Sequence, residues 1–150
     1  MIRFAGLLAF AVAMIFPQTM PPDLAALARK ARLASPVVAW CAGEFREGRP
    51  GAYAVAVTSA ARGGRYLVLE SDATVTTLAA FTGPPGLACY TPEEARKLDV
   101  TIKESETIEG GIAPRWSTTV VCGFLDDTSA ACWQYSPDES AFVKIGEWVT

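Results

Sequence analysis

The four cysteines are the residues of this chain with the greatest capacity for chemistry, because a thiolate can attack an electrophile or bind a metal ion. No two of them have the C-x-x-C spacing of a redox or zinc motif, and the chain contains no His to complete a metal site. We therefore expect no reactive thiol, no metal and no cofactor. An even number of cysteines is typical of paired thiols in an oxidising compartment, so we predict two disulfides. The cysteines are Cys41, Cys89, Cys122 and Cys132.

Four cysteines allow three pairings, and local geometry favours one of them. The segment between Cys122 and Cys132 has a turn signal, Asp-Asp-Thr, at 126–128. Pairing these two cysteines creates a hairpin with a three-residue loop. Residues directly opposite each other on antiparallel strands have a Cβ spacing that a disulfide can bridge. The sequence therefore predicts Cys122–Cys132, and Cys41–Cys89 follows by elimination.

Carboxylates are the other candidates for chemistry. Glycoside hydrolysis needs two acids about 5–10 Å apart in a cleft, and the nearest candidates are the pairs Glu93/Glu94 and Glu104/Glu106. Their positions, at a helix start and along a polar strand, favour structural and solvated roles. The chain has no G-x-S-x-G elbow, phosphate-binding loop or dinucleotide-binding glycine motif. We expect no enzyme, with a small hydrolase that uses carboxylates or a Ser–Lys pair as the alternative.

The C-terminal third predicts one further constellation, an aromatic face with a cation. If strand 130–135 pairs with strand 142–149 across the turn Ser-Pro-Asp-Glu-Ser, alternate residues of both strands share a face. Large aromatic side chains with a polar handle give ligand contact at low entropic cost, so this face could bind a saccharide or a partner protein. A second sheet or a helix covering the face is the alternative. The residues are Trp133, Tyr135, Phe142, Lys144 and Trp148.

The opposite face of the same strands is compact and aliphatic, and it holds the predicted disulfide, so we assign it to the core. A one-residue slip in the turn between the last two strands would move the whole last strand to the other face. The predicted core residues are Val120, Cys122, Phe124, Cys132, Val143 and Ile145.

The elements that must position these residues form an α+β fold, a small and mostly antiparallel β-sheet with one short capped helix. The clearest local signal is Thr-Pro-Glu-Glu at 91–94, a capping box with Pro at the first helical position, and we expect that helix to end near Asp99. We expect another helix over 23–33 and a weak strand over 100–108. The other predicted strands are 37–41, a hairpin of 52–58 with 65–70, 74–81, and a meander of 117–125, 130–135 and 142–149.

The first residues have the pattern of an export signal. Arg3 precedes an apolar run at 4–16, which Pro17 ends. Such a run covers about 20 Å as a helix, short of the roughly 30 Å hydrocarbon layer of a membrane. We predict a signal peptide over 1–28 and one exported domain over 29–150. A cut after Ala13 and an uncleaved anchor are the alternatives.

Composition limits the class of partner. A net charge of −3 over 150 residues gives no basic stripe for nucleic acid. With 51% hydrophobic and 19% charged residues the chain can form a packed core. We expect a periplasmic or secreted bacterial protein with no membrane span after signal cleavage. The leading hypothesis is a non-catalytic binding module, an inhibitor or accessory factor of a cell-envelope enzyme that binds an envelope protein or saccharide. A structural subunit of an envelope assembly is a further alternative.

Overall fold

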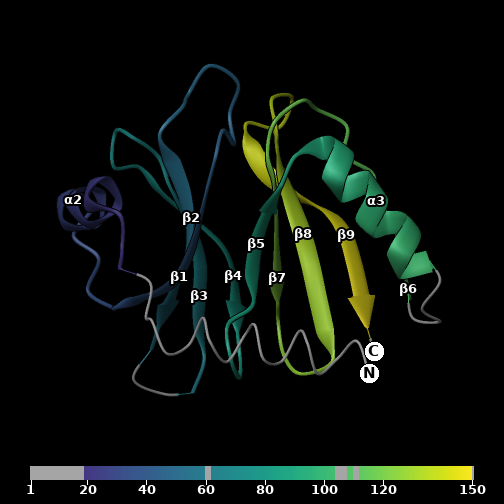
Figure 1. The fold of residues 1–150 in the computed structure, drawn as a ribbon, viewed down its shortest axis with the longest axis horizontal. Helices are drawn as coiled ribbons and strands as arrows, with labels where there is room; N and C mark the ends of the chain where they lie inside the picture. Colours follow the sequence, from purple (N-terminus) through teal and green to yellow (C-terminus); the bar gives the residue numbers. More distant parts are fainter. Residues whose placement is uncertain (1–18, 60–61, 104–107, 110–111, 150) are drawn as a thin grey trace.

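A computed structural model describes residues 19–59, 62–103, 108–109 and 112–149. The fold is α+β with antiparallel strands, as the sequence predicts, and in the described residues the strands form two separate sheets accompanied by two helices (Figure 1). Residues 1–18 of the predicted leader and the candidates Glu104 and Glu106 lie outside the described residues.

The first sheet is a four-stranded meander with the order β1-β2-β3-β4. The second sheet has five strands in the order β5-β7-β8-β9-β6 and contains the predicted C-terminal meander. The first sheet comprises β1 (Val37–Gly43), β2 (Ala52–Thr58), β3 (Gly64–Leu69) and β4 (Val75–Phe81), and the second comprises β5 (Leu87–Tyr90), β6 (Ile108–Glu109), β7 (Val120–Phe124), β8 (Ser129–Ser136) and β9 (Ala141–Val149).

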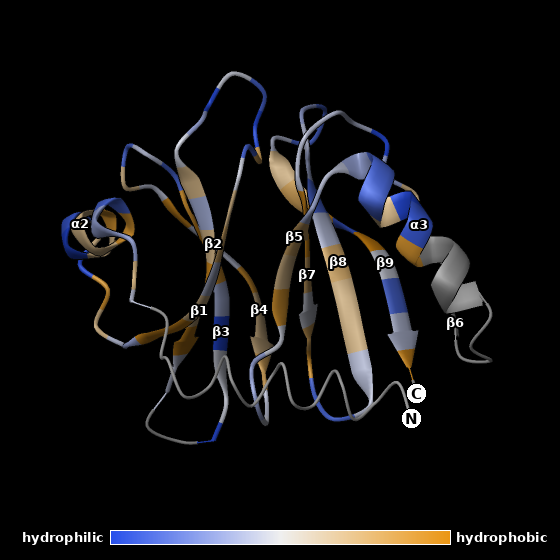
Figure 2. Cartoon of the chain, in the orientation of Figure 1, coloured by the Kyte–Doolittle hydropathy of each residue, from blue (hydrophilic) through white to orange (hydrophobic). Residues whose placement is uncertain are grey.

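The two sheets pack face to face, and each carries a helix on its outer face (Figure 1). Helix α2 (Pro22–Lys30) covers the first sheet, and helix α3 (Pro92–Lys103) covers the second. Hydrophobic residues concentrate on the strands, whereas both helices also carry hydrophilic residues (Figure 2). The result is a layered order of helix, sheet, sheet and helix, in which both faces of the second sheet are covered.

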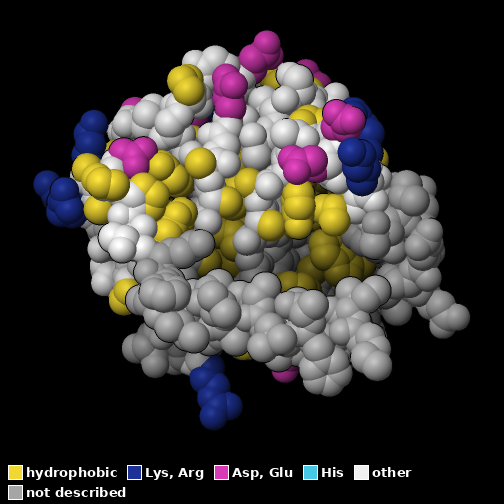
Figure 3. Space-filling view, in the orientation of Figure 1, with side chains coloured by type: hydrophobic (Ala, Val, Ile, Leu, Met, Phe, Trp, Pro, Cys, Tyr) yellow, Lys and Arg dark blue, Asp and Glu magenta, His cyan; other side chains and the backbone are white. Residues whose placement is uncertain are grey.

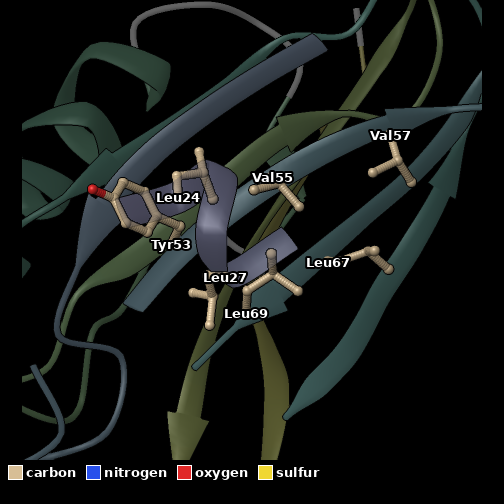
Figure 4. Packing of buried hydrophobic residues seen from close by; sticks show 7 residues of the cluster. All are labelled: Leu24, Leu27, Tyr53, Val55, Val57, Leu67 and Leu69. Carbon is tan, nitrogen blue, oxygen red and sulfur yellow. The ribbon is translucent and has the colours of Figure 1, made fainter. Parts of the chain in front are cut away.

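Helix α2 belongs to the core of the domain. Leu24 and Leu27 point from it toward the first sheet (Figure 4) and are 0% and 8% exposed. The hydroxyl of Tyr53 donates a hydrogen bond of 2.8 Å to a carboxylate oxygen of Asp23. The predicted helix over 23–33 is therefore present, and its apolar stripe packs as its spacing requires. The strand residues of this cluster are Tyr53, Val55, Val57, Leu67 and Leu69.

Both predicted disulfides are present. Cys122 and Cys132 are directly opposite each other on β7 and β8, as the hairpin register requires. Cys41–Cys89 joins β1 to β5 and therefore links the two sheets. In the chain-entropy model such a long loop contributes about 4 kcal/mol to stability.

Helix α3 is longer than predicted. Thr91 and Glu94 form the expected capping box, in which the Glu94 N–H donates to the Thr91 hydroxyl and the Thr91 N–H donates to the Glu94 carboxylate. The helix continues past Asp99 to Lys103, so the strand predicted over 100–108 is wrong for its first residues. No Gly or Pro lies between Asp99 and Lys103 to end the helix, and the weak alternation of β-branched residues there does not override a helix that has already begun. Of the described residues in this region, Ile108–Glu109 forms a strand, β6, and 104–107 lie outside the described residues.

Tyr66 is the main polar link between the sheets. It lies on β3 and is fully buried, and its hydroxyl donates a hydrogen bond of 2.7 Å to the Phe124 carbonyl of β7. The same hydroxyl accepts a bond of 3.2 Å from the Gly86 N–H. A Cβ added to Gly123 would lie 2.7 Å from the Tyr66 ring, so glycine there permits the close approach.

We expect Tyr66→Phe to lower the free energy of unfolding by about 1–2 kcal/mol, because it leaves the Gly86 N–H and the Phe124 carbonyl without their partner. Urea unfolding measures the change. Burial raises the pKa of Tyr66 above its usual 10.0. Its contribution is thus fully present below pH 10 and is lost as the pH rises through the raised value. Equal alkaline losses of stability in the wild-type chain and in the variant would contradict this role.

Candidate functional site

The candidate site is a cleft of about 330 Å³ between the two sheets, between β4 and β9. Strand β4 is an edge of the first sheet, and in the described part of the chain β6 covers only residues 147–148 of β9. The cleft therefore lies on the side of the domain opposite β1, β5 and their disulfide. We call it the β4–β9 cleft. It is lined by Arg46, Thr76, Thr77, Leu78, Trp133, Tyr135, Ser140, Ala141, Phe142 and Lys144.

Four of the five residues predicted as an aromatic face meet in this cleft. Trp133, Tyr135, Phe142 and Lys144 line it, and their register is the predicted one, with Tyr135 opposite Phe142 and Trp133 opposite Lys144. Trp133 is only 4% exposed, because the first sheet covers it, and its ring centroid lies 6.3 Å from that of Tyr66. The predicted cover by a second sheet thus holds for Trp133, which forms the floor of the cleft.

Trp148 does not belong to this face, and its predicted placement is wrong. A β-bulge between Cys132 and Trp133 sets Cys132 opposite Gly146, so that Trp148 pairs with Ala130. The extra residue moves the end of β9 to the opposite face of the sheet. There Trp148 packs with the disulfide cluster under α3 and lines a separate apolar pocket of about 360 Å³.

The predicted core face also needs correction. Val120, Cys122, Cys132 and Ile145 pack in one cluster with Ala95 of α3, so the helix covers this face and not the aromatic one. Val143 is partly exposed and lies outside that cluster, and Phe124 is 51% exposed. Phe124 lies at the end of β7, where α3 does not cover it.

Figure 3 shows hydrophobic side chains gathered on one side of the molecule between Lys and Arg residues that lie over α2 and α3.

Tyr135 forms the wall of the cleft and is held from two sides. The Phe142 ring meets it edge to face at a centroid distance of 5.4 Å. The guanidinium carbon of Arg46 lies 4.3 Å from the centre of the Tyr135 ring, within the range of a cation–π contact. Arg46 comes from the loop between β1 and β2, so residues far apart in the sequence meet at this ring.

A buried carboxylate orients Arg46. The side chain of Glu70, which directly follows β3, is 3% exposed, and one of its oxygens lies 3.0 Å from Arg46 Nη2. Arg49 Nη1 approaches the other oxygen at 3.7 Å. A buried charge is stable only when it is paired, so Glu70 fixes the position of both arginines. In the sequence, segment 44–51 has the composition of an ordinary polar loop. The sequence feature that could have indicated the ion pairs is Glu70, an acidic residue at the end of an otherwise apolar strand.

Lys144 is the exposed cation of the cleft. Its ammonium lies 3.2 Å from a Glu147 carboxylate oxygen, and both side chains are about half exposed, at 45% and 44%. A surface pair of this kind contributes little to stability and exchanges readily for a ligand group. Lys144 can therefore serve an incoming partner without disturbing the fold.

Bulges shape both sides of the cleft. In β4 the register shifts around Leu78, which lines the cleft, and in β9 it shifts next to Lys144. Bulges bend an edge strand and re-aim its side chains, and they also hinder pairing with the edge of another sheet. The cleft is thus set by the backbone as well as by its side chains.

The other candidates for chemistry do not converge. Glu94 is bound in its capping box, where the Thr91 backbone N–H lowers the pKa of the carboxyl, and neighbouring Glu93 also lies in the first turn of α3, remote from the cleft. Among the described residues, no group of three or more His, Cys, Asp or Glu side chains could hold a metal ion. Neither helix in that part of the chain has the length and apolar character needed to cross a membrane.

Comparisons of the chain with protein-family models, with curated proteins and with solved structures found no match. The interpretation of the cleft therefore depends on its own geometry.

Proposed function

We propose that this protein is a non-catalytic binding module of the bacterial cell envelope, which acts as an inhibitor or accessory factor of an envelope enzyme through the β4–β9 cleft. The observation that carries the proposal is the convergence of Tyr135, Phe142, Lys144 and Arg46 on one cleft. Tyr and Arg are the residue types that dominate binding energy at protein interfaces, and both are held here in fixed positions before a partner arrives.

Export is part of this proposal. The apolar run at 4–16 and the helix breaker Pro17 support a signal peptide, and the two disulfides are typical of an oxidising compartment such as the periplasm. Disulfides that fix both sheets also suit a module that must keep its binding surface rigid outside the cell.

A pull-down from periplasmic extract tests the proposal. We expect the wild-type chain to retain one envelope enzyme in a stoichiometric complex and to change the activity of that enzyme. Lys144→Glu reverses the exposed charge of the cleft and places it beside Glu147, so retention of the enzyme should fall at least tenfold. Lys30→Glu, an equal charge change at an exposed position of α2, is the matched control and should bind as the wild-type chain does.

Two results would contradict the proposal. Equal retention of the enzyme by Lys144→Glu and by the wild-type chain would remove the cleft from the interface. Hydrolysis of cell-wall fragments by the purified chain, lost in Glu93→Gln or Glu104→Gln, would instead establish the hydrolase alternative.

A further inference from the structure

A second pocket, of about 310 Å³, shares Arg46 and Tyr135 with the β4–β9 cleft and adjoins it. We call it the arginine pocket. Arg49 of the β1–β2 loop and the segment 116–118 supply the other lining side chains that could bind a ligand. These residues are Arg46, Arg49, Trp116, Ser117, Thr118 and Tyr135.

The charges of the arginine pocket are not balanced at its base. Glu70 supplies one buried carboxylate to the guanidinium groups of both Arg46 and Arg49. Glu70 alone therefore does not neutralise both arginines, although exposed Asp72 also lies close enough to Arg49 for the two charges to interact. Each guanidinium has five N–H donors, and together these are more than Glu70 can accept. Glu47 also lines the pocket, but it is exposed to solvent, where water and salt screen its charge.

Both carboxylate oxygens of Glu70 are buried without a hydrogen-bond partner among the described residues, although the two arginines approach them as ion pairs. Two further atoms of this kind belong to residues that line the pocket. They are Nε of Arg46 and the hydroxyl oxygen of Thr118, a residue that is 8% exposed. Buried polar atoms without a partner are rare in folded proteins and need an explanation. A bound ligand that accepts hydrogen bonds would provide one.

The wall segment is held in place before any ligand binds. The Gln134 side chain, which is fully buried, accepts a hydrogen bond of 3.1 Å from the Arg115 N–H. Its amide nitrogen donates bonds of 2.9 Å to the carbonyls of Trp116 and Thr118. Glu70 fixes one side of the pocket and Gln134 fixes the other, so binding costs little ordering of the protein.

We propose that the arginine pocket binds a sugar ring that bears a carboxylate. A guanidinium pair recognises a planar carboxylate through parallel hydrogen bonds. A simple carboxylate would use the arginines alone. A ring joined to the carboxylate also uses the Trp116 and Tyr135 rings for its apolar face and the Ser117 and Thr118 hydroxyls for its own hydroxyl groups.

Titration with D-glucuronate, followed by ligand-observed NMR, tests this site on the intact chain. D-glucose is the neutral control for the sugar ring, and glutarate is the control for a carboxylate without a ring. We expect saturable binding of glucuronate, at least tenfold weaker binding of glutarate, and no saturation with glucose.

Variants then locate the binding. Arg49→Gln should weaken glucuronate binding at least tenfold, and Thr118→Val should weaken it several-fold. Arg65→Gln, on the outer face of the first sheet, should leave binding within twofold of the wild type. Thermal unfolding checks that each variant folds, and the half-exposed Arg49 should tolerate its replacement.

Three results would overturn the assignment: no saturable binding of glucuronate, equal affinity for glutarate, or unchanged affinity in both Arg49→Gln and Thr118→Val. The pull-down measures the cleft through Lys144, whereas this titration measures the pocket through Arg49. Failure of the envelope-enzyme proposal and failure of the sugar site are therefore distinguishable.

Discussion

Trp133→Ala should lower the free energy of unfolding by about 3–5 kcal/mol, the range for truncation of a large buried aromatic side chain. Trp133 is 4% exposed and packs between the sheets with Tyr66 and Phe81. Urea unfolding followed by circular dichroism measures the loss without depending on tryptophan fluorescence.

Lys144→Ala is the control for this variant, because Lys144 is the cross-strand neighbour of Trp133 but is exposed. Its effect on stability should stay within about 0.5 kcal/mol. An unchanged free energy of unfolding in Trp133→Ala would show that the sheets do not pack over this residue. If the expected loss occurs, weaker binding by Trp133→Ala cannot be assigned to ligand contact, and Lys144 variants become the informative ones.

Leu24→Ala should cost about 2–5 kcal/mol, because it empties a fully buried position between α2 and the first sheet. The prediction applies to protein recovered from the exported fraction, and mass spectrometry of the same sample gives its first residue. A cut after Ala28 would remove Leu24 and Leu27 together, and with them the cover of the first sheet. We therefore expect the mature chain to begin before Pro22.

Arg29→Ala is the matched change on the exposed side of α2 and should alter stability by no more than about 0.5 kcal/mol. A mature chain that begins at Arg29 would contradict the expectation for Leu24 and would restore the leader boundary predicted from the small-residue pattern at 26–28.

Local signals explain what the sequence predicted well. The turn at 126–128 fixes the register of its hairpin, and that register alone places Cys122 opposite Cys132. The capping box at 91–94 likewise starts α3 from contacts within one turn. In both cases the deciding interactions join residues that are close in the sequence.

The position of Trp148 depended on a β-bulge that the prediction of regular alternation did not include. The register of β8 and β9 is as predicted from the turn up to Trp133, and one bulge then reverses every later side chain of β9. Assigning alternate residues to the two faces of a sheet assumes a regular strand. One extra residue therefore places every later side chain of the strand on the opposite face from the predicted one. Gly146 was the available indication, because an isolated glycine inside a strand often marks a bulge.

Long-range pairing hid the charged part of the site. Glu70, Arg46 and Tyr135 come from three separate parts of the chain. Arg46 meets Glu70 when the first sheet forms, and it meets Tyr135 only when the second sheet packs on the first. In the sequence the arginines have the pattern of ordinary loop residues, because Glu70, the carboxylate that pairs with them, lies 24 residues after Arg46. A charged residue at the end of the run Tyr66–Leu69 was the available indication.

The covalent link between the sheets has a mechanical consequence. Cys41–Cys89 joins them along the β1–β5 side, and the β4–β9 cleft lies along the opposite side. The disulfide therefore holds the two sheets together along one side, and the sheets can separate more easily along the opposite side. A ligand larger than the cleft therefore has to displace β4 from β9, because the disulfide limits the separation of β1 from β5.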